Sequence, residues 1–409
     1  SGVSYPKVRV NRAHRDWSTM GDGGHGEESA SQVKWMTENM MLKLKSVTFL
    51  GLLGLVVGCN AIRPGETVAP LITDHGVPFV AKDFYPAFSW DRVPVFMMFA
   101  DNDRMLLDSE VEKIASETTF ICIEKQHGQA TFGDAVLGLK HEQQVFEKRN
   151  PDMVVLGYLN SALTYPFTRY TQMFRPESID QHPDLKRFLL VDPKTGEPRK
   201  FMGQYCLNIL HPEMRAWWSD AGADMVREGG ADGILIDQMH GFKWLHPKGQ
   251  RQDVEAGVAD MMRQLKDKIG DDKIFVANNA ARIDAIFEIA DAFLFEHYKR
   301  SATHTKEKLL EDWQLMRKIA DAGKICIYRF GAEPEVDSPL AAFSDGRNRM
   351  IGKHDEFADL SQEQLEFYLA VYLIGAQPYS YFLWNWGWSL KTGPLEHYPA
   401  FHKPLGKPL

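Results

Sequence analysis

Eight short apolar segments, separated by amphipathic helical stretches, restrict the possible folds of this chain more than any other feature of its sequence. Several are apolar at nearly every position, which is typical of strands buried on both faces. The apolar segments are Val93–Ala100, Phe120–Ile123, Met153–Leu159, Gly233–Ile236, Ile274–Ala277, Ala292–Phe295, Ile325–Tyr328 and Tyr379–Trp384. The helical stretches are Ser109–Ser116, Asp134–Arg149, Pro212–Glu228, Val254–Ile269, Ile283–Ile289, Lys306–Ala322 and Gln362–Gly375. This alternation predicts a (β/α)8 TIM barrel, with a doubly wound open sheet as the alternative.

Two longer connections interrupt the regular alternation. The first, Asn160–Leu210, contains a turn sequence at Pro193–Gly196 between Leu189–Asp192 and Arg199–Tyr205. We expect it to form a β-hairpin in the third βα loop. The second connection, Gly331–Leu360, follows the seventh strand. Long loops at this end of a barrel shape substrate clefts.

Residues at several helix boundaries have the expected chemistry. Gly229, Gly230 and Gly323 are placed to end helices, because glycine adopts the left-handed conformation that such ends need. Ser361, with Gln364 three residues later, predicts a capping box at the start of the last helix.

The N-terminal region has the features of a bacterial lipoprotein signal. Lys43 and Lys45 precede the apolar segment Val47–Val57, which is too short to span a bilayer, and a small residue then precedes Cys59. This order resembles a lipobox, in which the cysteine is lipidated and becomes the mature N-terminus. Asn60 follows in place of the aspartate typical of inner-membrane retention, which favours an outer-membrane lipoprotein facing the periplasm or the cell surface.

These patterns divide the chain into four regions. Residues 1–40 show no hydrophobic period and are expected to be disordered or an upstream extension, and residues 41–59 are the lipoprotein signal. Residues 60–92 are a linker and barrel lead-in, and residues 93–409 are the catalytic barrel.

Composition and motifs argue against several classes of partner. Lys and Arg number 47 against 55 Asp and Glu, a net charge of -8, which excludes a generally basic nucleic-acid-binding protein. No glycine-rich phosphate loop follows any predicted strand, so no nucleotide cofactor is expected. Cys122, Cys206 and Cys326 are expected to be buried thiols. Neither their spacing nor Asp101-Asn102-Asp103 fits a metal site, so we predict no metal.

Two carboxylates end predicted strands and are the candidate catalytic pair. Asp237 ends the fourth strand, and the next expected helix begins only at Val254, too far away for Asp237 to cap it. Glu296 ends the sixth strand, where an ion pair with a nearby Lys or Arg is the alternative interpretation. Because the C-terminal strand ends of a barrel form its active site, the pair predicts glycoside hydrolysis by two carboxylates.

Polar and aromatic residues after the other strands complete the predicted site. Polar groups at nearly every strand end suit the recognition of sugar hydroxyls, and exposed Trp side chains stack on the apolar faces of sugar rings. The candidate substrate-binding residues are Asp101, Lys125, His127, Tyr158, Asn160, Gln238, His240, Asn278, Asn279, His297, Tyr298, Arg329, Trp384 and Trp386.

A family resemblance appears at the fourth strand. The segment Asn208–Trp217 followed by Ala231–Asp237 resembles the "(D/N)-x-x-x-P-x-x-R" and "D-G-(I/V)-x-x-D" motifs of the glycosidases near the polygalactosaminidases of glycoside hydrolase family 114. The ending His397-Tyr398-Pro399, with Lys403–Gly406, is similar to the same group. The resemblance covers roughly residues 93–409.

The pairing of Asp237 with Glu296 also resembles the endo-1,3-fucanases of glycoside hydrolase family 168. That resemblance implies that the strand-four aspartate is the nucleophile and the strand-six glutamate the acid/base, as in a retaining and endo-acting enzyme. The implied substrate is an extracellular polysaccharide, with a sulfated fucan as the candidate.

Two other functions fit parts of the pattern. A non-catalytic surface glycan-binding protein would keep Trp384 and Trp386 without needing both carboxylates. A polysaccharide lyase would use Tyr298 or His297 as its base. Serine hydrolase chemistry is disfavoured, because no Gly-x-Ser-x-Gly motif occurs.

Overall fold

The computed structural model describes residues 71–101, 104–296, 305–335, 338–343 and 353–406. These residues belong to a compact unit, Val68–Leu409. The expected upstream extension 1–40, the lipoprotein signal 41–59 and Cys59 lie outside the described residues, as do His297 and Tyr298.

Within the described residues, the main sheet has eight strands, all parallel, that follow one another in chain order. Each expected apolar segment overlaps one of them. The strands are β1 (Met97–Phe99), β2 (Phe120–Ile123), β3 (Val154–Asn160), β6 (Gly233–Asp237), β7 (Ile274–Asn278), β8 (Ala292–Glu296), β9 (Ile325–Phe330) and β10 (Ser380–Trp384).

The first and last strands meet, which closes the sheet into a barrel. Val95 forms a parallel bridge with Phe382. The amide of Phe96 donates to the carbonyl of Phe382 over 3.0 Å, and the amide of Phe382 donates to the carbonyl of Pro94 over 2.7 Å. An open doubly wound sheet would leave these edges unpaired, so the predicted (β/α)8 barrel is confirmed.

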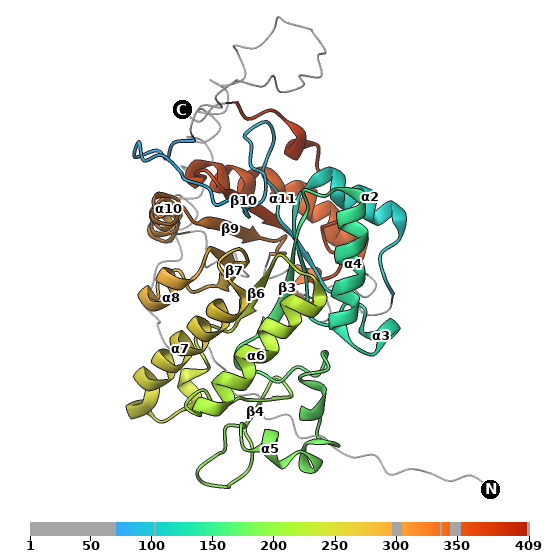
Figure 1. The fold of residues 1–409 in the computed structure, drawn as a ribbon. Helices are drawn as coiled ribbons and strands as arrows, with labels where there is room; N and C mark the ends of the chain where they lie inside the picture. The colour runs from blue at the N-terminus through green and yellow to red at the C-terminus, as the bar shows by residue number, and fades with distance from the viewer. Residues whose placement is uncertain (1–70, 102–103, 297–304, 336–337, 344–352, 407–409) are drawn as a thin grey trace, which may run out of the picture. The chain divides into compact units, whose positions relative to one another are not determined.

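Helices follow the strands and surround the barrel (Figure 1). The α-helices are α2 (Asp108–Glu117), α3 (Gln129–Phe132), α4 (Ala135–Arg149), α5 (Pro183–Lys186), α6 (Pro212–Gly229), α7 (Arg251–Ile269), α8 (Asp284–Ile289), α10 (Lys306–Asp321) and α11 (His354–Gly375). The short 3-10 helices are η1 (Gln172–Phe174), η2 (Ile179–Gln181), η3 (Lys243–Leu245), η4 (Lys248–Gln250), η5 (Pro339–Phe343) and η6 (Pro399–His402).

The structure confirms one predicted helix boundary and corrects another. α6 ends at Gly229 and is capped by Gly230 at φ +65°, as the glycine pair predicts. The predicted capping box is wrong, because α11 begins at His354 and passes through that position. The hydroxyl of Ser361 is buried at 2.8 Å from the hydroxyl of Tyr398.

The insertion after β3 contains a hairpin, shorter than predicted and at its far end. β4 (Lys200–Phe201) pairs antiparallel with β5 (Gln204–Tyr205). The expected first arm contributes only single bridges, such as Val191 with Pro198. Figure 1 shows the insertion at one end of the barrel and the blue segment that starts at residue 71 at the other.

Residues 71–92 form part of the barrel's core. The Phe79 ring stacks on Tyr379 with ring centroids 4.5 Å apart, and the hydroxyl of Tyr85 donates to the carbonyl of Asp291 over 3.2 Å. Phe79 and Tyr85 join the cluster that fills the barrel interior. This part of the expected linker therefore covers the end of the barrel where the strands begin.

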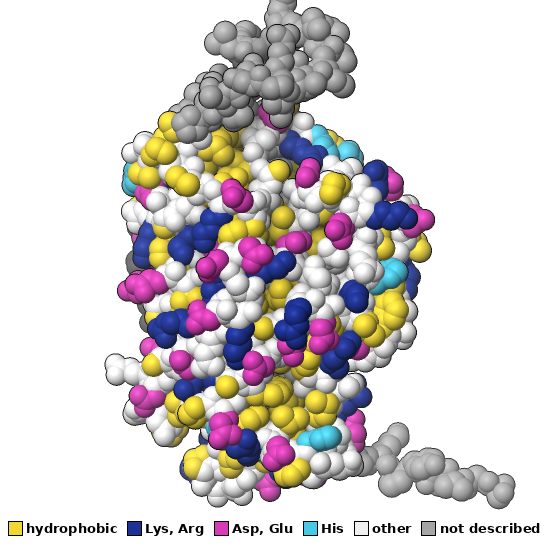
Figure 2. Space-filling view, viewed as in Figure 1, with side chains coloured by type: hydrophobic (Ala, Val, Ile, Leu, Met, Phe, Trp, Pro, Cys, Tyr) yellow, Lys and Arg dark blue, Asp and Glu magenta, His cyan; other side chains and the backbone are white. Residues whose placement is uncertain are grey.

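The surface has mixed charge. Figure 2 shows acidic and basic side chains interspersed over the visible face, with hydrophobic side chains gathered near the end that carries the insertion and also near the opposite end. Among the described helices, none is both long and apolar enough to span a bilayer.

Candidate active site

The alternation of side chains along the strands turns three polar residues into the barrel at adjacent strand ends. Leu235 and Leu294 belong to the buried cluster inside the barrel. Side chains two positions apart share a face, so Asp237 at the end of β6 and Glu296 at the end of β8 point into the same interior. Asn278 ends β7, which lies between these strands.

The amide of Asn278 joins the two carboxylates. Its Nδ2 donates to Oδ1 of Asp237 over 2.9 Å and to Oε2 of Glu296 over 2.6 Å. Because both contacts share this nitrogen, the two carboxylate oxygens are at most 5.5 Å apart, the sum of the two distances. The pair thus converges across the top of β7.

Asp237 accepts hydrogen bonds from three further groups. The Tyr158 hydroxyl donates to Oδ2 over 2.8 Å, and Asn160 Nδ2 donates to the same oxygen over 3.4 Å. The backbone amide of Gln238 donates to Oδ1 over 2.7 Å. Donors on both oxygens fix the orientation of this carboxylate, as a nucleophile requires.

Glu296 is fixed by the neighbouring asparagine. Nδ2 of Asn279 donates to Glu296 Oε2 over 3.3 Å, and the backbone amide of Glu296 donates to Oδ1 of Asn279 over 3.0 Å. The predicted residues Asn278 and Asn279 therefore position the candidate acid, and Asn278 also positions the candidate nucleophile.

Three non-glycine residues within two positions of a strand end have left-handed backbones. These are Lys125 at φ 47°, Gln238 at φ 61° and Asn279 at φ 52°. Such conformations cost on the order of 1–3 kcal/mol and concentrate at functional sites. They occur beside both candidate carboxylates, at the end of the barrel where the site is expected.

Lys125 brings a cation to this site. Its Nζ lies 4.7 Å from the Tyr158 ring centroid and 5.2 Å from that of Trp388, and it pairs with the buried Glu124. Burial lowers the pKa of Lys125 to about 8, although the charges of Asp237 and Glu296 oppose that shift. Lys125 therefore places its ammonium group within electrostatic reach of both candidate carboxylates.

Trp388 is a second aromatic residue beside Lys125, and it was not predicted from the sequence. It is partly exposed, and the Arg329 guanidinium lies 4.9 Å from its ring centroid. Arg329 is buried and donates through Nε to Oδ1 of Asn385 over 2.8 Å. Arg329 thus braces the wall of the site through Asn385, another residue that was not selected.

The two selected tryptophans occupy other positions. Trp384 is buried with its ring 5.4 Å from Tyr368 of α11, and Trp386 is fully buried. Neither presents a surface on which a sugar could stack. Trp388 is therefore the candidate for stacking on a sugar ring, and Trp384 and Trp386 are not.

His127 and Asp101 take part in structural contacts. His127 is buried, its Nε2 lies 2.8 Å from Oε1 of the buried Glu142, and its Nδ1 accepts from the amide of Asp101 over 3.4 Å. Oδ2 of Asp101 accepts from the amide of Leu390 over 2.8 Å. Both ring nitrogens of His127 are engaged, so it holds two loops together and is not available to a sugar.

His240 extends the site along the loop after β6. Its ring lies 4.4 Å from that of Trp244, which is 46% exposed, and burial lowers the pKa of His240. Trp244 was not selected from the sequence, because nothing in its neighbourhood marks it as exposed.

A closed parallel barrel with paired carboxylates where its strands end is the architecture of barrel glycoside hydrolases. The chain belongs to the family described as "Hypothetical glycosyl hydrolase family 15" (GHL15), whose model matches residues 147–409. The matched segment includes Asp237 and Glu296.

Solved structures with a similar fold are distant in sequence. The glycoside hydrolase domain of PelA from Pseudomonas aeruginosa is 12% identical over 67% of this chain and 91% of that chain, with a TM-score of 0.42. Aspergillus fumigatus Ega3, solved in complex with galactosamine, is 13% identical over 67% and 90%, with a TM-score of 0.37. An Anoxybacillus alpha-amylase is 11% identical over 78% and 75%, with a TM-score of 0.45. No curated protein matches the chain in sequence.

Proposed function

We propose that this protein is a retaining glycoside hydrolase in which Asp237 attacks the anomeric carbon and Glu296 acts as acid and then as base. The observation that carries the proposal is the shared contact with Asn278, which limits the facing oxygens to at most 5.5 Å given contacts of 2.9 and 2.6 Å. Retaining enzymes hold their carboxyl groups about 5–5.5 Å apart, whereas inverting enzymes leave roughly 6.5–9.5 Å for a water.

The chemistry has two steps. Asp237 displaces the leaving oxygen to form a glycosyl-enzyme ester while Glu296 donates a proton to that oxygen. Glu296 then removes a proton from water as the water attacks the same carbon, which releases Asp237. The described residues supply both groups, and no cofactor is needed for either step.

The first-formed product should keep the anomeric configuration of the substrate. Two displacements at one carbon each invert it, so the net outcome is retention. Proton NMR during the first minutes of hydrolysis, before mutarotation, distinguishes the two anomers. An inverted first product would mean that Asp237 activates water and does not attack the sugar.

We propose an extracellular polysaccharide cleaved internally as the substrate, with a sulfated fucan as the first candidate because Asp237 and Glu296 end the fourth and sixth barrel strands. Digestion of a glycan panel followed by mass analysis of the products tests this choice. Oligomers of several lengths indicate endo action. A lyase would yield unsaturated uronates that absorb in the ultraviolet, and a non-catalytic binding protein would bind a glycan without shortening it.

We also propose that Cys59 anchors the protein to the outer membrane through a lipid. Cys59→Ser removes the thiol that accepts the lipid, so the protein should move from the membrane fraction to the soluble fraction. Immunoblotting of the two fractions measures the shift. Cys206→Ser is the matched control because that thiol is buried in the insertion, and equal membrane association of all three proteins would exclude the anchor.

A further inference from the structure

We propose that Glu117, His397 and His402 form a structural zinc site at the end of the barrel opposite the carboxylate pair. One ligand atom from each lies within 4.8 Å of those of the other two, and two imidazoles with one carboxylate are a donor set that Zn²⁺ binds in proteins. The residues come from two elements, the last turn of α2 and the segment around η6.

The contacts already approach metal geometry. Nε2 of His402 lies 3.0 Å from Oε2 of Glu117, whereas two tetrahedral zinc ligands at bonds of about 2.0–2.2 Å lie roughly 3.3–3.5 Å apart. Nζ of Lys113 forms an ion pair with the other Glu117 oxygen, Oε1, at 2.6 Å. A small separation of Glu117 and His402 would therefore admit the ion, with water as the fourth ligand.

The presence of His397 distinguishes this cluster from an ordinary ion pair between Glu117 and His402. The rings of His397 and His402 are nearly parallel, at 23°, with centroids 5.7 Å apart. This arrangement lets both rings offer a nitrogen to one divalent cation, which a single histidine–glutamate ion pair cannot do. Glu117 is also the last residue of α2, where the helix dipole favours positive charge.

The chain around the ligands is held in place. The carbonyl of His397 accepts from Nε2 of Gln362 over 3.0 Å, and the amide of Val93 donates to the carbonyl of Phe401 over 3.0 Å. A metal here would fasten the C-terminal segment to the end of α2. Such a site stabilises the barrel without taking part in the reaction, because Glu117 precedes β2 while the carboxylate pair lies where strands end.

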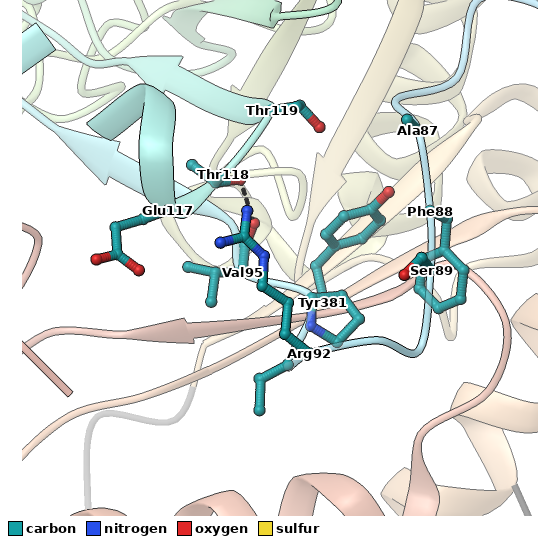
Figure 3. Close-up of a pocket in the computed structure, with 11 residues that line it drawn as sticks. Ala87, Phe88, Ser89, Arg92, Val95, Glu117, Thr118, Thr119 and Tyr381 are labelled. Atoms are coloured by element: carbon teal, nitrogen blue, oxygen red, sulfur yellow. Dashed lines mark hydrogen bonds between the residues drawn. The ribbon is translucent and has the colours of Figure 1, made fainter. Parts of the chain in front are cut away.

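The proposed site is open to solvent on the side of its two histidines. Glu117 lines a pocket of about 220 Å³ together with Arg92, Thr118 and Tyr381. Figure 3 shows Glu117 at the edge of this pocket, with its carboxylate turned away from the Tyr381 ring. His397 and His402 are themselves exposed.

The test is a zinc titration of the full-length chain, expressed without a polyhistidine tag and stripped with a chelator. Calorimetry should show one Zn²⁺ per chain, and thermal unfolding should shift upward by several degrees. His397→Gln should weaken zinc binding at least tenfold while leaving the unfolding temperature of the metal-free protein unchanged. His402→Gln should abolish the zinc-dependent shift.

His75→Gln is the matched control, because His75 pairs with Asp321 at 3.1 Å without a second imidazole nearby in the described structure. Equal zinc affinity in the wild type, His397→Gln and His75→Gln would overturn the proposal, as would a wild type that binds no zinc. X-ray absorption at the zinc edge should show two imidazole ligands. The rate of glycan hydrolysis, measured well below the unfolding temperature, should be the same with and without chelator.

Discussion

Asp237→Asn should lower kcat by about 10⁴-fold or more, because the variant lacks the nucleophile and keeps only binding and positioning. This corresponds to about 5.5 kcal/mol of lost transition-state stabilisation. The barrel should remain folded, since the Asn carbonyl can accept from Gln238 and Asn278 while its amide faces the Tyr158 hydroxyl, which can turn to accept. Initial rates and circular dichroism measure the two effects separately.

A control for Asp237 lies at the other end of the same strand. Asp232 precedes β6, accepts a hydrogen bond from the amide of Val155 over 2.9 Å, and has a pKa raised by burial. Asp232→Asn removes a carboxylate from the same segment without touching the candidate site, so its kcat should match the wild type. Activity near the wild-type level in Asp237→Asn, or an equal loss in both variants, would contradict the assignment.

The barrel could be predicted from the sequence because its strands are buried on both faces. Segments such as Ile274–Ala277 contain no polar residue, and a polar residue follows directly after each of them. This first polar residue marks the edge of the buried core. The carboxylates at the ends of β6 and β8 could therefore be predicted from the sequence alone. The shared contact with Asn278 could not, because it depends on how adjacent strands are staggered.

The errors arise where the sequence does not reveal which way a side chain points. Tyr381–Trp384 is apolar at every position, so the sequence does not show that Leu383 faces the interior and Trp384 faces α11. His127 pairs with Glu142, fifteen residues further along the chain, and only the docking of α4 brings them together. The Ser361 capping motif is equally local, and packing against Tyr398 overrides it.

Glu296→Gln should slow hydrolysis of the polysaccharide by about 10²–10⁴-fold, the usual contribution of general acid–base catalysis. The variant should fold normally, because the Gln carbonyl can accept from Asn278 and Asn279 in place of Oε2. The loss should depend on the leaving group. An aryl glycoside with an acidic phenol departs without protonation, so formation of the glycosyl-enzyme should be largely spared.

The second step then becomes limiting in Glu296→Gln, because no base remains to activate water. Azide attacks without losing a proton, so it should restore turnover of the aryl glycoside and give a glycosyl azide of retained configuration. Glu288→Gln, an exposed change on α8, should show neither the loss nor the rescue. If Glu296→Gln slowed all substrates equally and azide had no effect, Glu296 would be a binding residue, and the acid/base would have to be sought among other residues of the site.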